Sequence, residues 1–135
     1  MTSRHKKATL NLKIISAQNL TKNYIFGTSH PYVAIYLEPR TRISQYNYNK
    51  VGRTKTVKKS FNPEWNETYQ LEFDISCQSV ILDVFDEMRD DGDEFLGCAF
   101  VITNNGQTYE GLQSLTLQKR NPRSKVSGEL IVSCE

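Results

Sequence analysis

Apolar and polar residues alternate in short runs along most of this chain. In the first run, TLNLKIIS, Leu10, Leu12 and Ile14 fall on one face and Lys13 falls on the other. A period of two residues is typical of a β-strand with one buried face. Seven further runs of similar length follow, which makes eight predicted strands. They span residues 9–16, 32–37, 52–57, 65–73, 79–85, 95–102, 112–118 and 128–133.

The segments between these runs are rich in residues that favour turns. FGTSHP, FNPE, RDDGDE, TNNGQ and KRNPRS supply Gly, Pro, Asn and Asp, and no stretch carries a sustained apolar stripe at the 3.6-residue period of a helix. Eight short strands at this spacing predict an all-β fold, an antiparallel sandwich or barrel. We expect a basic N-terminal tail over residues 1–8 and one domain over residues 9–135.

Charge is distributed unevenly, although the net charge is only +2. Seven basic residues and no acid lie between Pro39 and Pro63, whereas the stretch from Glu64 to Glu94 holds eleven acids and one base, Arg89. Because the larger acidic segment opposes the basic one, nucleic-acid binding is disfavoured.

Three widely spaced cysteines, Cys77, Cys98 and Cys134, form no CxxC pair. This pattern favours reduced, buried thiols over a disulfide framework or a zinc site. The N-terminal stretch has no apolar run typical of a signal peptide, and no segment has the length of a membrane span. We therefore expect a cytoplasmic protein.

Three local signatures appear in a fixed order along nearly the whole chain. They are AQNLTKNYIFGTSHPYVAIYL, TKTVKKSFNPEWNETYQLEF and LDVFDEMRDDGDEFLGCAF. With these signatures the chain resembles a C2 domain, and the closing SGELIVS and the KNYIFGTS form of the first loop most resemble the N-terminal C2 domains of HECT-type, WW-domain-containing ubiquitin ligases. The resemblance implies an eight-stranded antiparallel β-sandwich of the Greek-key type. Within it we expect Trp65 to be a core residue.

The resemblance also allows the calcium ligands of the family to be checked one by one. In C2 domains that bind calcium, about five carboxylates from the first and third loops hold the ions. The matching first-loop positions, Asn23 (or its neighbour Tyr24) and His30, are not acids. In the third loop Asp86 and Glu94 are retained, with Asp93 beside Glu94, while Met88 stands at another ligand position. Neither imidazole nor thioether is a calcium ligand, so we expect no metal and no other cofactor.

The basic run GRTKTVKKS suggests a different binding surface. We expect Arg53 and Lys55 to share an exposed face of a strand, with Thr54 and Thr56 turned inward. In C2 domains the corresponding strands often form a cationic groove for phosphoinositide headgroups. The resemblance therefore implies a lipid-binding site at Arg53, Lys55, Lys58 and Lys59 with Lys50 at its rim. Tyr24, Ile25 and Phe26 of the first loop are candidates for apolar contact with a membrane or a protein.

We interpret the chain as a non-catalytic module that targets a larger protein to anionic phospholipid membranes, independently of calcium. It would be a peripheral membrane protein and a monomer in isolation. The alternative is a protein-interaction or autoinhibitory module of a HECT-type ubiquitin ligase, with the HECT domain or another protein as partner. The sequence contains no nucleophile elbow and no phosphate-binding glycine loop, so an enzymatic activity of this domain is not expected.

Overall fold

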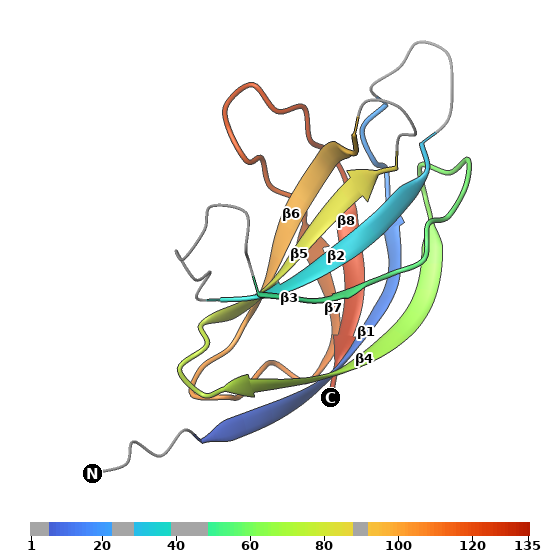
Figure 1. Cartoon of the computed structure of the whole chain (residues 1–135). Coiled ribbons are helices and arrows are strands. Elements are labelled where there is room, and N and C mark those ends of the chain that lie inside the picture. Colours follow the sequence, from blue (N-terminus) through green and yellow to red (C-terminus); the bar gives the residue numbers. More distant parts are fainter. Residues whose placement is uncertain (1–5, 23–28, 39–48, 88–91) are drawn as a thin grey trace.

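The computed structural model describes residues 6–22, 29–38, 49–87 and 92–135. It has eight strands in two four-stranded antiparallel sheets, which confirms the predicted all-β sandwich (Figure 1). The strands are β1 (Lys7–Gln18), β2 (Pro31–Leu37), β3 (Asn49–Arg53), β4 (Glu64–Asp74), β5 (Ser79–Asp86), β6 (Glu94–Ile102), β7 (Gly111–Thr116) and β8 (Glu129–Cys134).

The first sheet has the strand order β4-β1-β8-β7. Residues alternate between buried and exposed along β1 and β4, as their sequence pattern predicts. Leu10 and Leu12 are opposite Leu71 and Tyr69 of β4 and point toward the other sheet, while Lys13 is exposed. One face of this sheet therefore forms half of the core, and the other face is in contact with solvent.

The second sheet has the order β3-β2-β5-β6. Its central strands β2 and β5 are buried along almost their whole length. Val33, Leu82 and Val84 belong to the core between the sheets, whereas Ile81 and Asp83 point to the outer face and are nevertheless buried. The outer face of β5 is therefore covered by other parts of the chain.

The core contains the residues that the apolar runs indicate. Trp65 is 8% exposed and belongs to the core cluster, which confirms its expected role. All three cysteines are buried free thiols, as their spacing predicts.

The third strand differs from the prediction. A strand was predicted over residues 52–57, but β3 ends at Arg53. The next residue, Thr54, is buried, and its side-chain Oγ1 accepts a hydrogen bond from Val33 N (2.9 Å). A side-chain hydroxyl therefore takes the place of the backbone carbonyl that would accept this bond in a regular β-sheet. Thr54 points inward as expected. Thr56 does not, because its half-buried hydroxyl donates a hydrogen bond to Glu87.

Four connections meet at one end of the sandwich, which we call the loop end. Gln18 pairs with Glu129, so β8 starts where β1 ends, and β4 also begins beside the end of β1. Pro31 and Glu94 both pair with Asp86, so β2 and β6 start where β5 ends. The described residues that follow or precede these strand ends, 19–22, 29–30, 54–63, 87, 92–93 and 117–128, therefore share this end, and β8 runs away from it to the C-terminus (Figure 1).

Candidate functional site

The acids retained at the expected calcium positions are already bonded to the protein. The backbone N–H of His30 donates a hydrogen bond to Oδ1 of Asp86 (2.7 Å), and Asp86 is 3% exposed. The hydroxyl of Tyr32 donates to Oδ2 of Asp93. Burial, together with this bond, raises the pKa of Tyr32 above its ordinary value, so Tyr32 stays a neutral donor.

Asp86 and Asp93 alone do not supply the ligands that a calcium ion needs. Calcium requires six to eight oxygen ligands, several of them carboxylates. Within the described ranges no group of three or more His, Cys, Asp or Glu side chains is placed to hold a metal ion. The positions Asn23, Tyr24 and Met88 lie outside the described residues.

A row of arginine and aromatic side chains in contact crosses the outer face of the second sheet near the loop end. The guanidinium carbon of Arg53 lies 3.6 Å from the ring centroid of Tyr32. The ring centroids of Tyr32 and Phe85 are 5.6 Å apart, and the ring centroids of Phe85 and Phe95 are 6.0 Å apart. At the far side the guanidinium carbon of Arg120 lies 4.1 Å from the Phe95 ring. We call these five residues the arginine–aromatic row.

Both arginines of the row are also ion-paired. Arg53 Nη2 contacts Glu87 Oε2 at 2.5 Å, and Arg120 Nη2 contacts Asp83 Oδ2 at 3.1 Å. A hydrogen bond from Thr56 and the nearby Arg53 hold the pKa of Glu87 below its usual value. The charge of Arg53, one of the predicted lipid ligands, is therefore partly neutralised within the domain.

The other predicted lipid ligands are exposed. Lys50 shares the outer face of β3 with Arg53, because their partners on β2 are two residues apart. The backbone N–H of Lys55 donates to Glu67 Oε2 (2.9 Å), and the backbone N–H of Lys59 donates to Nδ1 of His30 (3.2 Å). These backbone bonds fix the path of the connection and leave the ammonium groups of Lys55, Lys58 and Lys59 in solvent. The apolar candidates at positions 24–26 lie outside the described residues.

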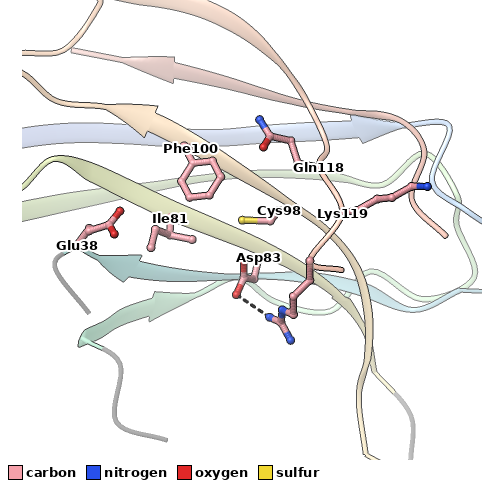
Figure 2. A pocket seen from close by; sticks show the side chains of 8 residues that line it. Glu38, Ile81, Asp83, Cys98, Phe100, Gln118 and Lys119 are labelled. Carbon is pink, nitrogen blue, oxygen red and sulfur yellow. Dashed lines mark hydrogen bonds and ion pairs between the residues drawn. The ribbon is translucent and has the colours of Figure 1, made fainter. Parts of the chain in front are cut away.

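A pocket of about 370 Å³ opens on the outer face of the same sheet, farther from the loop end (Figure 2). It is lined by Glu38, Ile81, Asp83, Cys98, Phe100, Gln118, Lys119 and Arg120. Asp83 is 3% exposed, and the dashed line in Figure 2 marks its ion pair with Arg120, which closes one side of the pocket. Since that ion pair neutralises the buried carboxylate, we interpret Asp83 as an anchor for Arg120.

Sequence reasoning missed Glu87 and Arg120. The partners of these residues are 34 and 37 positions away, so only the strand register brings them together. One signal was available: residues 117–128 contain four basic residues and no acid.

Among the described residues, no helix is long and apolar enough to cross a membrane.

Comparison with known proteins agrees with this architecture. Residues 8–118 match the C2 domain family. The chain is 36% identical to the E3 ubiquitin-protein ligase Nedd-4 of Drosophila melanogaster and 38% identical to NEDD4 of Mus musculus, in each case over 90% of its own length. It is 30% identical to Synaptotagmin-5 of Arabidopsis thaliana over 67% of its length. The chain spans only 12–15% of the length of these relatives.

Solved structures show the same fold at lower sequence identity. A C2 domain of plant Extended Synaptotagmin 1 superposes with a TM-score of 0.73 at 23% identity, covering 94% of this chain and 92% of that one. A structure of a pair of C2 domains from Extended-Synaptotagmin 2 gives a TM-score of 0.70 at 22% identity, covering 100% of this chain and 43% of that one. The sandwich is therefore a known fold.

Proposed function

The chain belongs to the C2 domain family, and from this premise we propose that it targets a larger protein to anionic phospholipid membranes without calcium. The C2 fold is a non-catalytic module, so the contribution of the domain is binding. The observation that carries the proposal is a set of exposed lysines on the 54–63 connection, Lys55, Lys58 and Lys59, which have no ion-pair partner among the described residues.

The binding that these lysines supply is modest. A basic residue near an anionic membrane contributes about 1 kcal/mol, so three contribute about 3 kcal/mol, equivalent to a dissociation constant of several millimolar. Arg53 contributes less to membrane binding than an unpaired arginine would, because its guanidinium forms an ion pair with Glu87. Useful targeting therefore needs further contacts, such as insertion of apolar residues 24–26, or avidity from other domains.

The hydrogen bonds and burial of the acids at the expected calcium positions support independence from calcium. Asp86 is buried and bonded to the backbone of His30, and Asp93 is bonded to Tyr32. Asp86 is also almost fully buried, and the matching first-loop positions carry non-acidic residues. The charge that draws the domain to an anionic surface then comes from its own lysines.

The test is binding of the domain to vesicles of phosphatidylcholine mixed with phosphatidylserine or a phosphoinositide. We expect Lys55→Glu with Lys58→Glu to reduce binding by at least a hundredfold, since two attractive charges become repulsive ones. The fold should persist, because both side chains are exposed. If this variant bound vesicles as well as the unmodified domain, the proposed surface would be wrong.

A second candidate is a protein-interaction or autoinhibitory module of a HECT-type ubiquitin ligase. The similarity to NEDD4 ligases over 90% of the chain favours it. Under this alternative Phe26→Ala would disrupt a complex with the HECT domain, while the Lys55 and Lys58 substitutions would leave that complex intact.

A further inference from the structure

We propose that the β7–β8 connection, residues 117–128, is a second site for anionic phospholipid headgroups, with Arg123 and Lys125 as its phosphate ligands. The inference rests on the proposed function and adds a surface that the resemblance does not suggest. The connection contains Lys119, Arg120, Arg123 and Lys125 and no acid. All four side chains are exposed.

The base of this connection is held firmly against the sandwich. Leu117 N donates to the carbonyl of Gly128 (3.0 Å), which closes the connection. Ser127 Oγ donates to the carbonyl of Asn19 (2.7 Å), and Val126 packs against the core. In Figure 1 the connection, drawn in dark orange, lies beside the start of β6. Its position at the loop end is thus fixed by contacts on both of its arms.

The tip of the connection is ordered by a local turn. Asn121 Oδ1 accepts a hydrogen bond from Arg123 N (3.0 Å), and the carbonyl of Asn121 accepts one from Ser124 N (3.1 Å). An Asn side chain that bonds the backbone two residues ahead is a common way to fix a turn. The backbone that carries Arg123 is therefore arranged before any ligand binds, which lowers the entropy lost on binding.

A pocket of about 370 Å³ lies between this turn and the start of β6. It is lined by Glu94, Phe95, Asn121, Arg123, Ser124 and Lys125. The forked guanidinium of Arg123 and the ammonium of Lys125 are the groups that bind phosphate oxygens in proteins, and a serine hydroxyl can donate to a third oxygen. Within the described part of the chain neither cation has an ion-pair partner.

The charge of the pocket favours one class of phosphate. Two cations and the carboxylate of Glu94 give a net charge of about +1, which matches a singly charged phosphodiester better than a multiply charged phosphate monoester. The phosphodiester of an anionic phospholipid has this chemistry.

The arginine–aromatic row connects this pocket with the lysines of the 54–63 connection. Arg53, at one end of the row, directly precedes that connection, and Arg120, at the other end, belongs to the β7–β8 connection. Both arginines are fixed by ion pairs, to Glu87 and Asp83. The row therefore holds two basic segments at the same end of the sandwich. A membrane surface can contact both segments at once, whereas a small anion can contact only one.

The experiment compares two double substitutions that change the net charge equally. Arg123→Gln with Lys125→Gln removes the proposed ligands, and Lys7→Gln with Lys13→Gln removes two exposed lysines of β1 away from the pocket. Each variant is titrated with vesicles of phosphatidylcholine and phosphatidylserine. Since each basic residue near an anionic surface is worth about fivefold in affinity, the first variant should bind about 25-fold more weakly and the second should bind within about twofold of the unmodified domain.

Each outcome supports or overturns a distinct statement. Equal losses in the two variants, or no loss in the first, would overturn the second site, while a continued effect of Lys55→Glu with Lys58→Glu would leave the proposed function standing. Absence of vesicle binding by the unmodified domain would overturn both. Competition by millimolar inorganic phosphate at matched ionic strength would identify a free anion as the ligand and overturn the membrane assignment. Thermal unfolding of each variant verifies that the fold is retained.

Discussion

Gly128, at the base of the β7–β8 connection, lies where the chain permits no side chain. Its φ is +98°, and a Cβ atom added there would lie 2.2 Å from the carbonyl oxygen of Gln18 and 2.8 Å from that of Asn19. Both atoms belong to the backbone, so no rotamer change relieves the clash. Gly128→Ala adds a left-handed-region cost of about 1–2 kcal/mol to an overpacking cost of about 1–3 kcal/mol. We predict a loss of about 2–5 kcal/mol of unfolding free energy, a large share of the roughly 5–15 kcal/mol typical of a domain.

Urea denaturation measures this loss, and Gly92 provides a matched control. Gly92 has a φ of +81°, but a Cβ atom added there would meet nothing within 4 Å. Gly92→Ala therefore carries the backbone cost of about 1–2 kcal/mol without the clash. With a slope of about 1.5–2 kcal/mol per M, the urea midpoint should fall by about 1–3 M for Gly128→Ala and by only about 0.5–1.3 M for Gly92→Ala. Equal shifts in the two variants would refute the argument from close approach.

Three further predictions concern the site, the pH response and the core. Glu87→Gln removes the ion pair of Arg53. In a vesicle titration the affinity of the domain for anionic membranes should therefore rise by about fivefold, and weaker binding would contradict this prediction. Burial, with the hydrogen bond to Glu67, raises the pKa of Tyr69, so the folded state keeps a proton that the unfolded state loses. Unfolding free energy should fall as pH rises above about 10, and urea titrations should show a shallower fall for Tyr69→Phe. Leu82→Ala should lower the unfolding free energy by about 2–5 kcal/mol in urea denaturation, since Leu82 is fully buried.

The fold could be predicted from the sequence because its strands have strong local patterns. The alternation in residues 9–16 and 65–73 corresponds to β1 and β4, with ends that differ by one or two residues. The prediction failed where polar residues alternate on both faces, at 52–57. There the end of β3 depends on one side-chain hydrogen bond, from Val33 N to Thr54 Oγ1, and a pattern of residue types cannot specify such a bond.

The candidate site was only partly predictable for a related reason. The density of lysines at 55–59 indicates a basic surface, and their exposure agrees with that expectation. The pairing of Arg53 with Glu87, however, depends on register between segments 34 residues apart. The same applies to Arg120, which stacks on Phe95 and pairs with Asp83. These contacts decide which cations remain available to a ligand, and residue types along the chain cannot specify them.

Vesicle co-sedimentation of the unmodified domain, with calcium and with a chelator, tests the central proposal most directly. The domain should sediment with vesicles containing phosphatidylserine to the same extent in both conditions, and the bound fraction should fall as salt screens the lysine and arginine charges. Binding that requires calcium and resists salt would contradict the proposal, because a metal ion, and not the charge of the lysines, would then hold the domain on the membrane.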